Sequence, residues 1–265
     1  MIVHNFDPIL IDFGIIQIRW YSLAYVVGIL LGWWYGRAII KRKTNQTNQQ
    51  NYLSNFDDLI GYLIIGIIFG GRIGYVLFYS PSFYFENPFE IFKIWKGGMS
   101  FHGGLAGVIF TTYFFSIRKN LNYKLYFDTI SCVAPIGIFF GRIANFINGE
   151  LYGLPTEKPW GIVFPEVDNL MRHPSQLYEA LLEGIILFII LNFLIFKKVL
   201  RHGKISFLFL ILYGVFRIVC ENFRVPDEHI GYLVGNFSMG SILSVVMIIF
   251  GIFFFTKVIS NEENK

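Results

Sequence analysis

The chain has 265 residues, of which 54% are hydrophobic and 19% aromatic, whereas only 15% are charged. Soluble globular domains carry about 25% charged residues, so this composition excludes an ordinary water-soluble protein and favours a membrane protein. The net charge of +4 is small, and the basic residues form short clusters between apolar stretches, which argues against nucleic acid as a partner.

The N-terminal segment, residues 1–18, is predicted to form an arm outside the membrane. A membrane-spanning helix needs about 20 mostly apolar residues, and stretches of that kind predict about seven spans. We therefore expect an all-α, polytopic membrane protein whose single transmembrane domain covers residues 1–265. The predicted spans are residues 19–39, 58–79, 99–117, 125–147, 176–196, 205–222 and 237–257.

Lysines and arginines cluster in alternate connections, which sets the expected orientation. Cytoplasmic connections of membrane proteins carry an excess of these residues. The basic connections contain Lys41, Arg42 and Lys43, then Arg118, Lys119 and Lys124, then Lys197, Lys198, Arg201 and Lys204. The other connections, residues 80–98, 149–172 and 222–236, are aromatic and mixed in charge, so they are predicted to be outer-face loops. Seven spans then place the N-terminus outside and the C-terminus in the cytoplasm.

Two connections have a distinctive composition. Residues 83–95 are rich in Phe, Tyr and Trp, which predicts a segment lying along the outer membrane interface. Residues 44–51 are polar and rich in Asn and Gln, which predicts a flexible cytoplasmic loop.

Small residues recur at four-residue spacing, which lets helices approach closely in lipid. The pattern predicts helix contacts at Gly66, Gly70 and Gly74, at Gly103 and Gly107, and at Gly137 and Gly141.

Ionisable side chains interrupt the apolar spans. Each costs on the order of 2.5–3.5 kcal/mol at the bilayer centre and is a functional candidate by default. These residues are Arg72, His102, Arg142, Arg217 and Glu221. With the orientation above, the three arginines come late in spans that run outward, whereas His102 and Tyr21 come early in spans that run inward. We therefore expect Tyr21, His102 and the three arginines at one level in the outer third of the membrane, around one hydrated pocket.

Helical spacing assigns further polar residues to the same faces. Arg142 shares a stripe with Asn145 and Asn148, and Arg217 shares a face with Tyr213, Glu221 and Arg224. Alternative interpretations apply to single residues: Arg72 and Arg224 can extend to the interface as long cationic side chains often do, and Tyr21 can belong to an aromatic belt. Cys132 and Cys220 show no metal spacing and are interpreted as small buried apolar residues.

Several arginines around a histidine favour an anionic substrate, because Arg binds phosphate through two parallel hydrogen bonds and stays charged. Near the outer leaflet, the headgroup of a membrane lipid is the obvious phosphate carrier. A histidine moves protons near neutral pH. No HExxH or GxxxxGK[ST] motif is present, and Ser100, in a sequence like GxSxG that ends in His102, is a weak rival as an acyl nucleophile.

The residues also resemble a known family. Residues 141–153, GRIANFINGELYG, are similar to the signature of the prolipoprotein diacylglyceryl transferases. Three further blocks resemble the same family in the same order: GGRIGYVLFY at 70–79, GGMSFHGGL at 97–105 and RHPSQLYE at 172–179. The segment YGVFR at 213–217, followed by Glu221, Arg224, Pro226 and Asp227, is similar as well.

The resemblance implies an enzyme of the bacterial plasma (inner) membrane with its active site toward the outer face. Such enzymes transfer the diacylglyceryl group of phosphatidylglycerol to the lipobox cysteine thiol in the signal peptide of a prolipoprotein. The product is a thioether, and glycerol phosphate leaves. Neither a metal nor a cofactor is expected.

Roles follow for the candidate residues. Arg142 and Arg217 are expected to hold the phosphate, and His102 is the candidate base for the thiol, with Tyr21, Tyr213 or a phosphate oxygen as alternatives. The remaining expected substrate-binding residues are Asn145, Asn148, Glu150, Gly153, Arg72, Glu221 and Arg224. The first three of these would also hold the glycerol hydroxyls and orient Arg142. Glu221 is expected to pair with Arg217 or Arg224. Ser175 is expected to cap the fifth span.

Two other classes of function fit the sequence less well. A transporter or flippase for anionic phospholipids is the main alternative, since an arginine-lined site can also carry a lipid. Transporters often show internal repeats, and the sequence shows none. A structural scaffold would not explain the charges within the spans.

Overall fold

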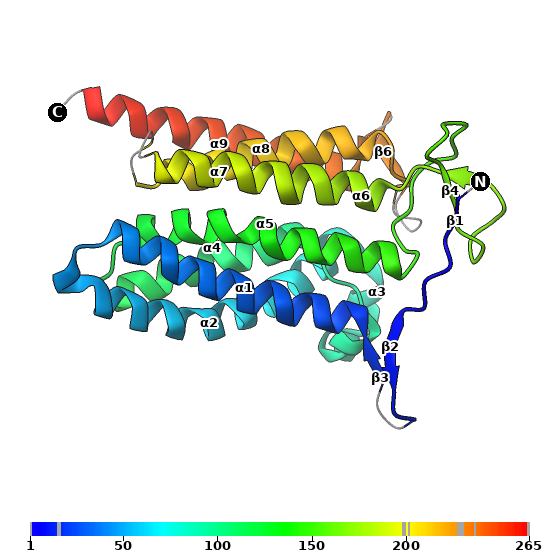
Figure 1. Cartoon of the computed structure of the whole chain (residues 1–265), viewed down its shortest axis with the longest axis horizontal. Coiled ribbons are helices and arrows are strands. Elements are labelled where there is room, and N and C mark those ends of the chain that lie inside the picture. Colours follow the sequence, from blue (N-terminus) through cyan, green and yellow to red (C-terminus); the bar gives the residue numbers. More distant parts are fainter. Residues whose placement is uncertain are drawn as a thin grey trace. The chain divides into compact units, whose positions relative to one another are not determined.

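The computed structural model describes residues 2–14, 17–197, 200, 202–226, 231–235 and 237–263. Lys198 and Arg201, which entered the orientation argument, and Asp227, which entered the resemblance, lie outside these ranges. The described chain is mostly helical (Figure 1), as predicted, with short strands in three places.

Among the described residues, five helical segments are long and apolar enough to cross a membrane, so the chain is a multi-pass membrane protein. They are α1 (Trp20–Lys43), α2 (Gln46–Phe78), α5 (Tyr123–Ile147), the continuous run Ser175–Phe196 and α9 (Met239–Glu263). Helices also occupy the other two predicted spans: α4 (Phe101–Arg118) and α8 (Lys204–Glu221), each of 18 residues. The count of seven spans stays a prediction.

The prediction of a flexible loop at residues 44–51 is wrong for most of that segment, because α2 already begins at Gln46. Gln is a good helix former, and a helix that is already fixed in lipid propagates at little cost. The side chain of Gln49 also donates to the Lys41 carbonyl at 2.8 Å. The connection between α1 and α2 is therefore a tight turn.

The chain divides into two compact units, residues 1–36 with 130–265, and residues 37–129. In the first unit, β1 (Ile2–Val3) pairs in parallel with β4 (Ile162–Val163), which pairs antiparallel with β5 (Met171–Arg172). The His4 ring nitrogen Nε2 lies 2.7 Å from the Phe146 carbonyl oxygen. The N-terminal arm is thus attached to the loop that follows α5.

Other elements of the first unit complete its frame. A hairpin of β2 (Ile9–Asp12) and β3 (Gln17–Arg19) precedes α1, and β6 (Tyr232–Val234) with β7 (Phe237–Ser238) precedes α9. The run Ser175–Phe196 consists of α6 (Ser175–Glu179), a π-helical stretch η3 (Ala180–Ile186) and α7 (Leu187–Phe196). Figure 1 shows α7, α8 and α9 side by side. Gly214 of α8 lets α9 approach, since a Cβ there would lie 2.6 Å from the Ile248 side chain.

In the second unit, α2 packs on α4 through the predicted glycines. A Cβ on Gly70 would lie 2.9 Å from the Gly107 Cα, and one on Gly74 would lie 2.6 Å from the Gly103 Cα. The α2–α4 contact is therefore confirmed. The third predicted pair differs: a Cβ on Gly137 or on Gly141 would meet nothing within 4 Å among the described atoms, although a Cβ on Gly28 of α1 would lie 3.1 Å from the Gly137 Cα.

The connection between α2 and α4 is built from short helices. They are α3 (Pro81–Glu86), η1 (Pro88–Phe92) and η2 (Ile94–Lys96). Its aromatic side chains are largely uncovered: Phe85 is 92%, Phe89 81% and Trp95 77% exposed. These side chains would have to meet lipid or another partner.

We expect Gly74→Ala to destabilise the protein by about 1–3 kcal/mol, because backbone must move to accept the methyl group. Gly61→Ala in the same helix is the matched control, since a Cβ at Gly61 meets nothing within 4 Å. The control should be neutral or stabilising by up to about 1 kcal/mol through helix propensity. Thermal unfolding in detergent micelles measures both, and equal melting temperatures would contradict the packing argument.

Candidate active site

Arg142 lies near the end of α5 and is fixed by two buried carboxylates. Its Nε atom lies 3.0 Å from Glu179 Oε2, and its Nη2 atom lies 3.3 Å from Glu183 Oε2. The Arg142 side chain is 14% exposed, whereas both glutamates are fully buried. Arg142 therefore has one edge on the carboxylates and one edge open.

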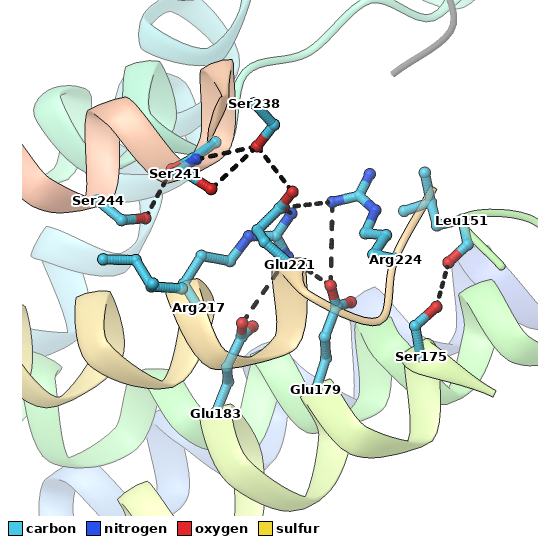
Figure 2. A network of polar contacts seen from close by, with 12 residues as sticks. Leu151, Ser175, Glu179, Glu183, Arg217, Glu221, Arg224, Ser238, Ser241 and Ser244 are labelled. Atoms are coloured by element: carbon cyan, nitrogen blue, oxygen red, sulfur yellow. Dashed lines mark hydrogen bonds and ion pairs between the residues drawn. The ribbon is translucent and has the colours of Figure 1, made fainter. Parts of the chain in front are cut away.

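Arg217 reaches the same carboxylates from α8. Its Nη1 atom lies 2.5 Å from Glu179 Oε1 and 3.7 Å from Glu183 Oε1, and its Nη2 atom pairs with Glu221. Arg224, just beyond α8, lies 3.4 Å from Glu221 Oε1 and 3.9 Å from Glu179 Oε1. Figure 2 shows Glu179 and Glu183 both pointing from their helix toward Arg217. The expected pairing of Glu221 with Arg217 and Arg224 is confirmed for both.

The cluster is balanced in charge. It contains three guanidinium groups, from Arg142, Arg217 and Arg224, and three carboxylates, from Glu179, Glu183 and Glu221. Burying an ion pair is tolerated only when each charge is compensated, and removing one partner typically costs about 3–5 kcal/mol. The pairing thus explains how these helices carry ionised side chains through an apolar environment.

The start of α9 holds the third carboxylate. Ser238 Oγ donates to Glu221 Oε2 at 2.8 Å and accepts from the Ser241 backbone N–H at 3.1 Å (Figure 2). Gly240 leaves room for this carboxylate, since a Cβ there would lie 2.9 Å from Glu221 Oε1. Glu221 is consequently oriented by two helices, α8 and α9.

A second polar group joins the end of α5 to the signature loop, by which we mean residues 148–153, the part of the family signature that follows α5. Asn145 Nδ2 donates to Glu150 Oε1 at 2.7 Å, and Asn148 Nδ2 lies 3.5 Å from the same oxygen. The expectation that these residues orient Arg142 is not met by the recorded contacts, which join Arg142 to Glu179 and Glu183. The physical reason is charge: a carboxylate compensates a buried guanidinium, and an amide does not.

The loop conformation itself is fixed from α6. The Leu151 backbone has φ 57°, an unusual value for a side chain that is not glycine, and its carbonyl accepts from Ser175 Oγ at 2.9 Å. The Glu150 carbonyl accepts from Gln176 Nε2 at 2.7 Å. The prediction that Ser175 caps the fifth span is wrong, because its hydroxyl donates to the loop and Pro174 occupies the cap position.

Two tyrosines predicted as catalytic candidates belong to this unit. Tyr213 is 1% exposed, one turn before Arg217, and its ring stacks on Phe209 at 5.7 Å. The Tyr21 hydroxyl lies 3.5 Å from that of Tyr25, and Asn145 and Glu150 face it. Tyr21 is thereby linked to the signature loop.

Gly153 brings three backbone segments together. Its N–H donates to the His173 carbonyl at 2.9 Å, it bridges to Arg224, and a Cβ there would lie 2.6 Å from the His173 Cβ. Its carbonyl accepts from Arg172 Nη1 at 3.1 Å. A side chain at Gly153 would displace the backbone at His173 and at Phe223, the residue before Arg224.

Two ionisable groups in the loop between α5 and α6 have shifted pKa values. The hydrogen bonds from Arg172 lower the pKa of the Asp168 carboxyl below its ordinary value, so this pair stays ionised at neutral pH. Burial, helped by Lys158, lowers the pKa of His173. His173 is thus neutral at pH 7, with Nδ1 lying 3.0 Å from the Tyr178 hydroxyl.

Arg72 belongs to the second unit and is surrounded by carbonyl groups. Its guanidinium donates to the carbonyl oxygens of Glu90, Ile91, Lys93, Gly97 and Gly98, at 2.6 to 3.4 Å. A guanidinium has five N–H donors, so these bonds use all of them. The geometry leaves no donor for a phosphate and gives Arg72 the role of fixing residues 90–98 on the end of α2.

His102 also lies in the second unit, as the second residue of α4. It is half-buried, and its ring meets that of Phe101 edge to face at 5.5 Å. Ser100, the weak rival nucleophile, caps α4, because its Oγ accepts from the Gly103 N–H at 3.2 Å. The position of Arg72 and His102 in the predicted pocket with Arg142, Arg217 and Tyr21 stays a prediction.

Two central residues, Glu179 and Glu183, were not among the predicted site residues. A signal for them was present, since both are acidic side chains within the predicted span 176–196 and face the same insertion cost as the arginines. Ser238 carried no comparable signal.

Comparison with known proteins supports the resemblance. The sequence model of the family described as "Prolipoprotein diacylglyceryl transferase" matches residues 8–257. The chain belongs to this family.

Individual relatives cover nearly its whole length. The chain is 49% identical over 255 residues to the phosphatidylglycerol–prolipoprotein diacylglyceryl transferase of Rickettsia bellii (strain OSU 85-389), which covers 96% of this chain and 95% of that one. It is 51% identical to the enzyme of the same name from Rickettsia felis, over 93% of this chain and 95% of that one. The Rickettsia canadensis enzyme of the same name is 50% identical, over 95% of this chain and 96% of that one. The family match thus includes every residue of the arginine–glutamate cluster.

We expect Arg72→Gln to release the connection between α2 and α4, because a glutamine amide cannot replace five donors to five carbonyls. Trypsin should then cut after Lys93 and Lys96 faster, by on the order of tenfold or more. Arg118→Gln is the control, since that guanidinium lies over the Phe114 ring, 4.3 Å from its centroid, at the far end of α4. Equal cleavage rates in the two variants would contradict this role of Arg72.

Proposed function

We propose that the chain transfers the diacylglyceryl group of phosphatidylglycerol to the lipobox cysteine thiol of a prolipoprotein signal peptide. The family match over residues 8–257 supports this activity, and the names of the relatives describe the same reaction. The observation in the structure that carries it is the arginine cluster, in which Arg142 keeps an open edge for an anion.

The proposed location is the bacterial plasma (inner) membrane, with seven spans and the site toward the outer face. The alternation of basic connections supports this orientation. In the first unit, Arg142 comes at the end of α5, Glu179 at the start of the next span and Arg217 at the end of α8. Under seven spans these three ends face the same side, which agrees with one site near the outer surface. Residues 83–95 would lie along that surface.

The open edge of Arg142 supports its role toward phosphate. Within the described part of the chain, the contacts recorded for Arg142 use Nε and Nη2 and leave Nη1 free. A guanidinium in that position donates to a phosphate oxygen without leaving its carboxylates. Arg217 is bound at both terminal nitrogens, so it contributes its fixed charge to the site.

The reaction needs no redox step. The cysteine sulfur forms a bond to the carbon of the diacylglyceryl group that carries the phosphate. The bond from that carbon to the phosphate oxygen breaks, and glycerol phosphate leaves with the electron pair. Negative charge grows on the leaving phosphate, and fixed cations stabilise that charge in the transition state. The thiol proton goes to a base, for which His102 is the first candidate and Tyr21, Tyr213 and a phosphate oxygen are the others.

The signature loop supports binding of the glycerol headgroup. Asn148 Oδ1 is buried and has no hydrogen-bond donor among the described residues, so it is able to accept from a substrate hydroxyl. Asn145 and Glu150 are joined to each other beside it. Gly153, Glu221 and Arg224 act on the substrate through this frame, since their contacts orient the cluster.

The test is to incubate the purified protein in vesicles with phosphatidylglycerol and a lipobox peptide. A thioether-linked diacylglyceryl peptide, detected by mass spectrometry, is the expected product. Movement of phosphatidylglycerol between leaflets without this product would indicate a transporter and overturn the proposal. Neither the family match nor the named relatives support that alternative.

We expect Arg142→Lys to lower the transfer rate by about 10²–10³-fold, the range seen when one donor to a developing charge is removed. Lysine keeps the charge, but it cannot hold two carboxylates and a phosphate in a fixed fork. Arg118→Lys is the control, because Arg118 is the last residue of α4 and none of its recorded contacts involves the cluster. The transfer rate of this variant should stay within about twofold of that of the unmodified protein. Normal transfer by the Arg142 variant would contradict its assignment to the phosphate.

A further inference from the structure

Glu179 differs from the other two carboxylates of the cluster in its set of contacts. Among the described residues, it is the carboxylate that contacts all three arginines, which come from α5, from α8 and from the segment after α8. Glu183 contacts two of them, at 3.3 and 3.7 Å. Glu221 contacts two that are its own sequence neighbours, Arg217 and Arg224.

The two oxygens of Glu179 serve different helices. Oε2 lies 3.0 Å from Arg142 Nε, and Oε1 lies 2.5 Å from Arg217 Nη1. Because one rigid, planar carboxylate forms ion pairs with both guanidinium groups, it determines the distance between them. The Arg142 contact also uses Nε, on the inner edge of the guanidinium, so Nη1 stays directed away from Glu179.

The backbone holds Glu179 in place from both sides. Glu179 is the last residue of α6, and the side chains of Ser175 and Gln176 in the first turn of α6 donate hydrogen bonds to the signature loop. The π-helical stretch that follows is a rare geometry that is often found at functional sites. Glu179 itself is fully buried, so its carboxylate is not exposed to bulk solvent.

We propose that Glu179 is the positioning residue of this site, which sets Arg142 and Arg217 at the spacing that clamps one phosphate. This inference rests on the proposed function. Glu179 does not touch the lipid; it acts through the two arginines. Its negative charge weakens the attraction of the site for an anion, and in return it fixes the direction of the donors.

This role predicts a separation of binding from turnover. Glu179→Gln leaves the cluster with one more positive charge and with a looser pair of guanidiniums. The KM for phosphatidylglycerol should therefore stay the same or fall, while kcat falls by about 10- to 100-fold, the range for misplaced catalytic groups. A residue that merely supported the fold would lower the amount of active protein and leave both constants of the folded fraction unchanged.

The experiment measures kcat and KM in vesicles of defined phosphatidylglycerol content with a lipobox peptide. Asp128→Asn is the matched control, because Asp128 is also a buried carboxylate, fourteen residues before Arg142 in the same helix. Its kcat should stay within about twofold of that of the unmodified protein. The kcat of Glu183→Gln should fall less than that of Glu179→Gln, since the recorded contacts of Glu183 are longer and do not include Arg224.

A double-variant cycle tests whether Glu179 acts through Arg142. The Arg142→Gln and Glu179→Gln changes combined should lower kcat by less than the product of the two single losses, because the part of the Glu179 effect that runs through Arg142 is already lost and the part through Arg217 remains. If the kcat losses of the two single variants multiply in the double variant, or if Glu179→Gln has a normal kcat, the proposal is overturned. If Glu179→Gln is not recovered as a monodisperse protein, Glu179→Asp decides: a lower kcat at unchanged KM supports the role, and unchanged constants overturn it.

The unmodified protein separates this proposal from the proposed function. If it forms no thioether product from phosphatidylglycerol, the proposed function fails before any variant is compared. If it forms the product and Glu179→Gln does so at the same rate, only the positioning role fails.

Discussion

Compensation of buried charge is the interaction on which the first unit depends. Three guanidinium groups and three carboxylates lie on α5, on the run from α6 to α7, on α8 and just beyond α8, and none of them could remain ionised alone in an apolar environment. Each helix must therefore present its charged side chain to the others. This requirement determines which faces of α5, α6 and α8 meet, and it extends to α9 through the hydrogen bond from Ser238 to Glu221.

The same compensation limits what the site can do. A cluster of unpaired arginines would attract phosphate more strongly, but it would be unstable in the membrane. The balanced cluster gives up part of that attraction and gains fixed directions for its donors, with the Nη1 edge of Arg142 left open among the described contacts. Stabilising a charge that develops during a reaction depends on such preorganised groups more than on net charge.

A different constraint shapes the second unit. There the helices α2 and α4 meet backbone to backbone at glycines, and the Arg72 guanidinium is directed at the carbonyl groups of the loop between them. Two of those carbonyls, at Glu90 and Lys93, also accept from backbone N–H groups of the loop. For the carbonyls of Ile91, Gly97 and Gly98 the recorded donor is the Arg72 guanidinium, and a buried arginine needs acceptors. The Arg72 cation thus has a structural role here, whereas the role proposed for Arg142 and Arg217 in the first unit is functional.

The membrane class, the approximate positions of the helices and the family were evident from the sequence, because apolar length, basic clusters and a long motif are local properties of the chain. The start of α2 at Gln46 was not, since the polar residues 44–51 carry no apolar pattern. The sequence also marked Arg142, Arg217 and Glu221, since the cost of burying a charge depends only on the span that carries it. It did not distinguish the role of Arg72 from that of Arg142. The sharing of Glu179 by Arg142 and Arg217 became visible in the folded chain, because the partner of a buried charge depends on which faces of distant helices touch.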